Sequence, residues 1–262
     1  MPEKKSQITP KKGTLALELP QKHQLEDYCK NKVEVPDYLK GLALPKNNFQ
    51  LGTDLWNRID FSAVRFFNNL PKKYIHKDDC PRPLIVVDAG HGGVDKGAIN
   101  RSVSPHIYEK TLTLSASESL AQTLYSKGAN VVLSRNFDCY PDLDLRREIA
   151  TSLKANFLIS IHYNSSPVRH KNFGSEVYTY PNATCPTTTV AMEMSDRLAK
   201  VDHTYVNQFR GTFEKKLKII KNAEIPSTLV ELAFIQDPKA RNTKYRNTQL
   251  EVISTSILNF LK

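Results

Sequence analysis

The feature that most constrains this chain is a short apolar run that ends in a glycine-rich turn with a histidine. The run is Leu84-Ile85-Val86-Val87, preceded by Pro83 and followed by Asp88-Ala89-Gly90-His91-Gly92-Gly93. Four consecutive aliphatic residues between a proline and a glycine cluster indicate a buried β-strand. A polar turn directly after such a strand is where an open α/β sheet carries its chemistry. We therefore expect this turn to belong to a functional site.

Segments with strand and helix patterns alternate from Pro83 onward. The apolar runs predict strands at 84–87, 130–134, 157–161, 175–180, 217–220 and 227–232. Helical periodicity predicts helices at 108–127, from a cap at Asp142 or Asp144 to about 153, at 188–200 and at 248–261. Strands that alternate with helices predict an α/β fold, in which a mostly parallel twisted sheet is flanked by helices on both faces.

The N-terminal part of the chain has a different pattern. Residues 1–47 mix Lys, Pro and Gln with little periodicity, and we expect a loosely docked extension in which 15–19 could add an edge strand. In residues 54–70 apolar side chains recur every four positions, which predicts an amphipathic helix that ends before Pro71. The predicted organisation is an extension at 1–82, helical and irregular, and a main domain at 83–262.

Composition narrows the choice of partners. The formal net charge of +10 favours a polyanionic neighbour: nucleic acid, an anionic membrane face or an acidic polymer such as cell wall. The basic residues are interleaved with acidic ones, so we expect general surface charge and no nucleic-acid partner. No run of eighteen apolar residues occurs, and no membrane span is expected.

The cysteines leave two interpretations open. Cys29, Cys80, Cys139 and Cys185 lie too far apart for a Cys-x-x-Cys metal site. An even number of cysteines permits two disulfides in an oxidising compartment, and four free thiols fit the sequence equally well.

Two histidines and two glutamates occupy positions that bear on chemistry. His91 follows the first strand, His162 ends the third, Glu231 lies near the end of a late strand, and Glu109 opens the first long helix. Because the carboxyl ends of parallel strands meet at one edge of a sheet, we expect these side chains to converge. Two His and one Glu are a ligand set of catalytic zinc, which keeps a fourth position for water. A further carboxylate such as Glu231 can take the proton during attack and pass it to a leaving amine.

Structural alternatives accompany these assignments. Glu109 can simply complement the dipole of its helix, and the glycines can form a tight turn. The glycine spacing matches neither Gly-x-Gly-x-x-Gly nor a Gly-Lys-Ser/Thr ending, which argues against a phosphate loop. Glu231 differs from the others because it interrupts an apolar strand, where a buried charge needs a partner. Asp88 is a candidate acceptor that orients one of the imidazoles, or a residue that only shapes the turn.

Ordered motifs across residues 83–262 resemble a known family. They are Val87-Asp88-Ala89-Gly90-His91-Gly92-Gly93 with Asp95 and Gly97, Glu109-Lys110, Val132-Leu133-Ser134-Arg135 with Leu143 to Arg146, Ser160-Ile161-His162-Tyr163-Asn164 and Pro226-Ser227-Thr228-Leu229-Val230-Glu231. Their content and order resemble the zinc-dependent N-acetylmuramoyl-L-alanine amidases of the amidase-3 type. The part of the chain at 83–262 would then be a zinc amidase catalytic domain.

The resemblance implies residue roles and a reaction. One Zn²⁺ ion would be held by His91, Glu109 and His162, with Glu231 as the catalytic carboxylate and Asn164 as a substrate-binding residue. The substrate would be peptidoglycan, cleaved between N-acetylmuramic acid and the L-alanine of the stem peptide during cell-wall remodelling or cell separation. Such an enzyme would be periplasmic or secreted, although no signal peptide is visible in this sequence. An activator protein would be a further partner, and the sequence does not identify it.

Two departures and two alternatives accompany the resemblance. Ala233-Phe234 and Gln236-Asp237 stand where the family usually has Gly-Phe and Ser-Asn, which bears on substrate preference. The segment between Tyr180 and Gly211 is short, so we expect no inserted helix that blocks the site. The alternatives are a zinc peptidase that acts on the stem peptide and a cell-wall-binding module without turnover. The presence of all four central residues argues against the binding module.

Overall fold

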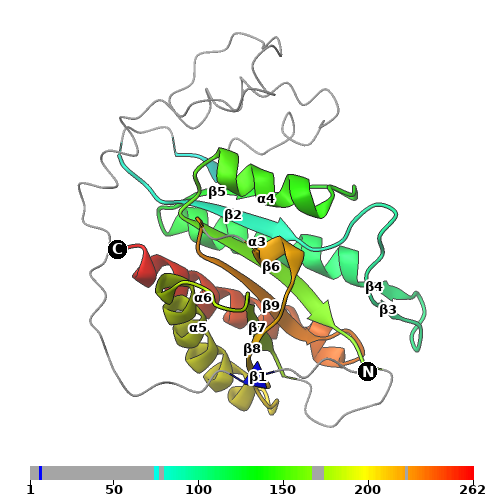
Figure 1. Cartoon of the computed structure of the whole chain (residues 1–262). Coiled ribbons are helices and arrows are strands. Elements are labelled where there is room, and N and C mark those ends of the chain that lie inside the picture. Colours follow the sequence, from blue (N-terminus) through cyan, green and yellow to red (C-terminus); the bar gives the residue numbers. More distant parts are fainter. Residues whose placement is uncertain (1–5, 8–73, 77–79, 167–173, 222–223) are drawn as a thin grey trace.

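The computed structural model describes residues 6–7, 74–76, 80–166, 174–221 and 224–262 (Figure 1). The helix predicted at 54–70 and the edge strand predicted at 15–19 lie outside the described residues. No helix in the described part of the chain has both the length and the apolar character needed to cross a membrane.

A seven-stranded sheet forms the centre of the structure, in the order β1-β8-β7-β9-β6-β2-β5. The strands are β1 (Ser6–Gln7), β2 (Leu84–Ala89), β5 (Asn130–Leu133), β6 (Phe157–Asn164), β7 (Glu176–Thr179), β8 (Gly211–Glu214) and β9 (Ser227–Phe234). Strands β5, β2, β6 and β9 are parallel, and β7 pairs with β9 antiparallel. The short strands β3 (Ile99–Asn100) and β4 (Ile107–Tyr108) form a separate antiparallel pair.

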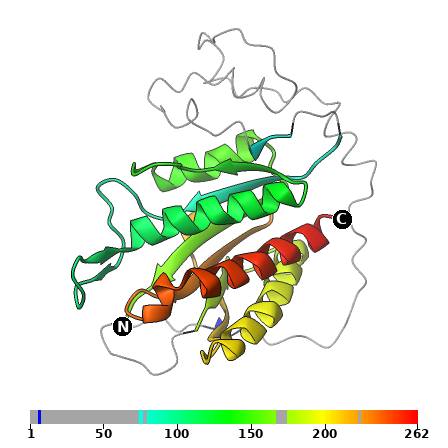
Figure 2. The same ribbon diagram turned by 180° about the vertical axis from the view of Figure 1, so that it is seen from behind.

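Helices cover the two faces of the sheet unequally. Three long helices pack on one face, as Figure 2 shows: α3 (Glu109–Ser126), α5 (Cys185–Thr204) and α6 (Thr243–Phe260). The other face is covered by α4 (Leu143–Ser152) and the 3₁₀ turn η4 (Lys218–Ile220), while η5 (Pro238–Arg241) precedes α6. The buried side chains form two clusters accordingly, a large one under α3, α5 and α6 and a smaller one under α4 and η4. The predicted α/β class is confirmed.

The prediction of a strand at 217–220 is wrong. Residues 218–220 form η4, and the strand that pairs with β7 is β8, at Gly211–Glu214. The backbone of Lys215 donates the last hydrogen bond to Thr179, and the chain then turns away from the sheet edge. Ile219 and Ile220 bury their side chains in the smaller cluster without strand pairing. A short apolar run has the same appearance in both cases, so periodicity cannot separate them.

The register of the sheet places the polar residues on the face covered by α4. Val86, Leu158 and Leu229 belong to the cluster under α4, and residues two positions further along a strand point to the same face. Asp88, His162 and Glu231 therefore continue this face toward the carboxyl ends of β2, β6 and β9. His162 lies directly opposite Glu231, which in turn lies opposite Glu176 of β7. His162, Glu231 and Glu176 thus form a polar row across β6, β9 and β7.

We predict that Asp142, and not Asp144, caps α4. The Asp142 carboxylate accepts a hydrogen bond of 2.9 Å from the backbone of Leu145, whereas Asp144 is exposed and pairs with Lys218. Asp142→Ala should lower the free energy of unfolding by about 1 kcal/mol, a typical value for a lost N-cap. Asp144→Ala is the matched control and should have a smaller effect in the same denaturant titration. An equal or larger loss in the control would contradict the assignment.

Candidate metal centre

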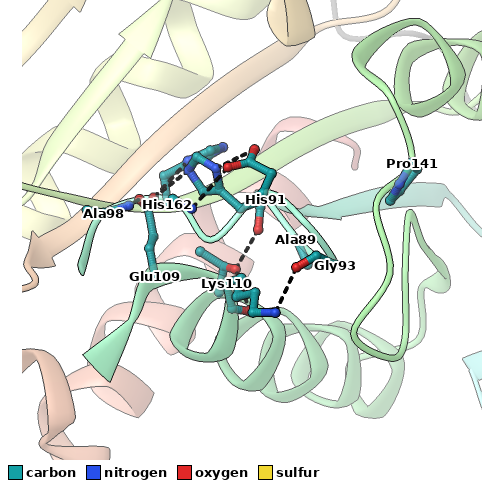
Figure 3. Close-up of polar contacts among 12 residues, drawn as sticks. Ala89, His91, Gly93, Ala98, Glu109, Lys110, Pro141 and His162 are labelled. Carbon is teal, nitrogen blue, oxygen red and sulfur yellow. Dashed lines mark hydrogen bonds and ion pairs between the residues drawn. The ribbon is translucent and has the colours of Figure 1, made fainter. Parts of the chain in front are cut away.

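Three side chains from distant parts of the chain converge at the carboxyl edge of the sheet (Figure 3). His91 lies in the loop after β2, Glu109 is the first residue of α3, and His162 lies near the end of β6. Glu109 Oε1 is 3.1 Å from His91 Nε2 and 3.0 Å from His162 Nδ1. One nitrogen or oxygen from each residue lies within 4.8 Å of the others, which is a group that could hold a metal ion.

Glu109 is the negative centre of this group. Its side chain is 5% exposed, and backbone N–H groups of Tyr163 and Ala98 donate to Oε1 and Oε2 at 3.0 and 2.8 Å. Burial opposes ionisation, but the hydrogen bonds and charges of His162 and His91 hold the pKa of Glu109 far below its ordinary value. The carboxylate is therefore ionised and fixed in position before any ligand arrives.

His91 is held in one orientation by Asp95. The Asp95 carboxylate lies 2.8 Å from His91 Nδ1 and also accepts the Gly97 N–H at 3.0 Å. An acceptor at Nδ1 fixes the tautomer and turns Nε2 toward Glu109. Burial by itself lowers the pKa of His91, but the hydrogen bonds and charges of Glu109 and Asp95 raise it above its ordinary value.

Glycine is required at two positions around the cluster because the backbone approaches the ligand groups closely. A Cβ atom on Gly90 would lie 2.3 Å from the His162 ring, and one on Gly97 would lie 2.6 Å from both Glu109 and His91. Gly97 also has a φ of +63°. His91 itself has a φ of +60°, which is uncommon for a residue with a side chain and marks a conformation enforced by its surroundings.

Two buried arginines hold the loop that carries His91. Arg135 donates to the carbonyls of Ala89 and Gly90, each at 2.9 Å. Arg146 donates to the carbonyls of Ala89 and His91 at 2.6 and 2.7 Å. Both guanidinium groups belong to residues that are 1% exposed. The carbonyl groups of this turn thus point toward the two buried arginines, while the His91 side chain points toward Glu109.

Asp88 lies beneath the same loop. Its Oδ1 pairs with Arg146 at 2.7 Å and accepts from Ser134 at 2.5 Å, while Oδ2 accepts from Ser160 at 2.6 Å. Burial opposes ionisation, but the charge of Arg146 and these hydrogen bonds lower the pKa of Asp88 to about 2. The carboxylate at Nδ1 of His91 is that of Asp95, whereas Asp88 is linked to His91 only through Arg146, which donates to the His91 carbonyl.

The remaining predicted residues lie beside the cluster. Glu231 is opposite His162 in the register of β6 and β9, and parallel strands are about 4.8 Å apart, so their side chains are neighbours on one face. The Asn164 amide donates to Glu176 Oε2 at 2.9 Å. The sequence pattern indicated no role for Asp95, Glu176 or Arg210. For Asp95 a signal existed, since it follows His91 by four residues inside the glycine-rich motif.

The α/β sheet thus carries two imidazoles and a buried carboxylate at its carboxyl edge, a group that could hold a catalytic metal ion. The family described as N-acetylmuramoyl-L-alanine amidase matches residues 85–262, and the chain belongs to this family. The resemblance inferred from the ordered motifs is thereby confirmed.

Similar proteins agree with this assignment. The chain is 30% identical over 181 residues to the sporulation-specific N-acetylmuramoyl-L-alanine amidase of Bacillus subtilis, covering 68% of this chain and 66% of that protein. It is 29% identical over 178 residues to the probable cell wall amidase LytH of Staphylococcus epidermidis, covering 68% and 57%. The chain thus spans less than two thirds of the length of these curated relatives.

A solved structure shows the same fold. The CwlD amidase of Clostridioides difficile, determined in complex with the GerS lipoprotein, superimposes with a TM-score of 0.62 at 25% identity. The match covers 69% of this chain and 98% of the CwlD chain.

The ion pair beneath the loop predicts an acid-sensitive stability. Asp88→Asn leaves Arg146 buried without its partner and should lower the free energy of unfolding by about 3–5 kcal/mol at pH 7. Since the pKa of Asp88 is lower in the folded state than its ordinary value of 3.8, its contribution is complete above about pH 4 and is lost as the pH falls toward 2. The variant should therefore lose less stability than the wild type across that interval.

The measurement is denaturant unfolding at pH 7 and between pH 4 and 2. Asp138→Asn is the matched control, because Asp138 makes an exposed ion pair with Lys110 and its loss should cost about 1 kcal/mol or less. Equal losses in the two variants would contradict the role of the buried pair.

Proposed function

We propose that the protein is a zinc-dependent N-acetylmuramoyl-L-alanine amidase that hydrolyses the amide bond between N-acetylmuramic acid and the L-alanine of the peptidoglycan stem peptide. The observation that supports this most directly is the His91, Glu109 and His162 cluster, in a chain that belongs to the amidase family.

The chemistry of the donor set fits zinc. Two imidazole nitrogens and one carboxylate are a ligand set of catalytic zinc sites, which leave one position open. Glu109 is ionised, and Asp95 orients His91 from behind, as is usual for histidines that bind metals. Zinc bound here would polarise the scissile carbonyl and lower the pKa of the attacking water.

Glu231 is proposed as the general base and acid. It lies opposite His162 on the adjacent strand, shares a face with it and is half-buried, and it is not one of the three clustered residues. In this role Glu231 accepts a proton from the attacking water and transfers it to the nitrogen of the departing L-alanine. The products are the glycan with a free lactyl carboxylate and a stem peptide with a free amino group.

Asn164 and Asp88 are proposed to assist in different ways. One amide hydrogen of Asn164 is used by Glu176, and the second is proposed to contact the substrate. Asp88 positions Arg146, which holds the His91 carbonyl, and so maintains the conformation of the loop without touching substrate.

Location and partners follow from the substrate. We propose that the protein acts outside the cytoplasm, periplasmic or secreted, and that its net charge of +10 favours the acidic wall polymer. An activator protein is proposed by analogy with the CwlD amidase, which was solved with the GerS lipoprotein. Residues 83–262 are proposed as the catalytic domain and 1–82 as an N-terminal extension.

Digestion of purified peptidoglycan tests the reaction. We expect the full chain to release stem peptides that begin with L-alanine and to leave intact glycan, as detected by mass spectrometry. A chelator should abolish release, and added zinc should restore it. Truncated stems that remain on the glycan would indicate a peptidase instead. Sedimentation with the wall without any release would indicate a binding module, and either result would contradict the proposal.

A substitution tests the role of Glu231. Glu231→Gln keeps the shape of the side chain but cannot accept the proton, so kcat should fall about 10²- to 10⁴-fold while bound zinc is retained. Zinc content by mass spectrometry and release of stem peptide are the two measurements. Glu251→Gln is the control, since Glu251 is an exposed residue of α6 that pairs with Lys127. Normal activity of Glu231→Gln would exclude Glu231 from the mechanism.

A further inference from the structure

A second polar group lies next to the proposed metal centre along the same edge of the sheet. Its centre is Glu176, the first residue of β7, which is fully buried. Glu176 Oε1 pairs with Arg210 Nε at 2.6 Å, and Oε2 accepts from Asn164 and from the Tyr178 hydroxyl. Glu176 lies opposite Glu231 in the register of β7 and β9. The group therefore borders the residue proposed as the base.

The Arg210 guanidinium is fixed on two sides and open on others. Its Nε donates a hydrogen bond to Glu176, and its Cζ lies over the Phe234 ring, 5.1 Å from the ring centroid. The side chain is 37% exposed. Among the described residues, the guanidinium forms no other hydrogen bond, so the terminal Nη1 and Nη2 groups remain as donors. A fixed planar group with two such donors matches a carboxylate.

Arg210 supplies a positive charge beside two carboxylates. Glu176 and Glu231 are adjacent carboxylates on neighbouring strands, and Arg210 is the cation that contacts the buried one. A guanidinium that served only to neutralise Glu176 would not need an exposed face. Because Glu176 orients the Arg210 side chain through Nε, its remaining donors are presented without further ordering cost.

The spacing sets which part of a peptide can reach Arg210. His162 and Glu176 are separated by two strand steps of about 4.8 Å, or about 10 Å in all. An extended peptide advances about 3.3–3.6 Å per residue, so about three residues cover that distance. A peptide whose scissile amide lies at the metal centre would bring its second or third residue to Arg210.

We propose that Arg210 is a specificity-determining residue that binds a carboxylate carried by the second or third residue of the substrate peptide. This inference rests on the proposed function for the position of the scissile amide. The guanidinium donates through Nη1 and Nη2 to the carboxylate, while Glu176 and Phe234 hold it in place. Arg210 contributes to substrate binding and takes no part in proton transfer.

The test compares substrates that differ in one group. Muramoyl tripeptides are prepared with a carboxylate at both positions, with a carboxamide at the second residue, and with a carboxamide at the third. We expect one carboxamide to raise the KM of the wild type about 10- to 100-fold with kcat nearly unchanged, as for a lost hydrogen bond to a charged group. Arg210→Gln should show the raised KM with every substrate and no longer discriminate among them.

A matched variant and a conservative one control for charge and folding. Arg197→Gln removes an arginine of α5 that pairs with Glu193, and it should behave as wild type. Arg210→Lys keeps the charge without the planar donors and should recover part of the discrimination at most. A uniform fall in kcat in Arg210→Gln, or discrimination that survives in it, would overturn the inference in favour of a purely structural pair with Glu176.

Peptide binding separates this inference from the proposed function. The corresponding free tripeptides, which begin with L-alanine, are titrated into the full chain by calorimetry, which needs no turnover. We expect the wild type to bind the acidic tripeptide about tenfold or more tightly than one of its carboxamides, and Arg210→Gln to bind them equally. Such discrimination without hydrolysis would contradict the proposed function alone, and its absence in the wild type would overturn the role of Arg210.

Discussion

The site depends on the buried contact between Asp88 and Arg146. Burial of two charges costs free energy, which their attraction offsets only when the remaining donors and acceptors are satisfied. Here Ser134 and Ser160 complete the carboxylate, and the carbonyls of Ala89 and His91 complete the guanidinium. The same hydrogen bonds that compensate the charges hold the loop. His91 is kept in a left-handed conformation by this network, and its imidazole faces Glu109 as a result.

Helices cover the two faces of the sheet unequally, and this explains why one face can carry polar residues. Under α3, α5 and α6 the strands contribute mostly apolar side chains, and that face serves as the main core. Under α4 and η4 the apolar cluster is smaller and gives way to Asp88, His162 and Glu231 toward the carboxyl ends. Strands β2, β6 and β9 therefore carry core residues under the three long helices. On the opposite face they carry site residues at their carboxyl ends.

Sequence patterns predicted the groups whose positions follow from strand direction. His91 and His162 end parallel strands and Glu109 begins the connecting helix, so they had to meet at one edge. Contacts made through the loop and the sheet register were not predictable in this way. Asp95 lies within a loop without periodicity. Glu176 lies in a strand that was predicted, but its position beside Glu231 depends on the antiparallel direction of that strand, which the pattern does not indicate. Arg210 had no role because the strand was expected at 217–220; with β8 unrecognised, nothing placed Arg210 at the sheet edge.

The reversal of β7 brings this second group to the carboxyl edge. Had β7 run parallel to β9, its last residue would lie beside Glu231; because it runs antiparallel, its first residue, Glu176, does. Strand β8 is parallel to β7, and Gly211 is therefore paired with Glu176, which places the preceding residue, Arg210, at the same end. The antiparallel direction of β7 thus places Arg210 next to Glu176 and Glu231 at the carboxyl edge of the sheet. It supplies the cation that an acidic peptide requires beyond the centre where its amide would be cleaved.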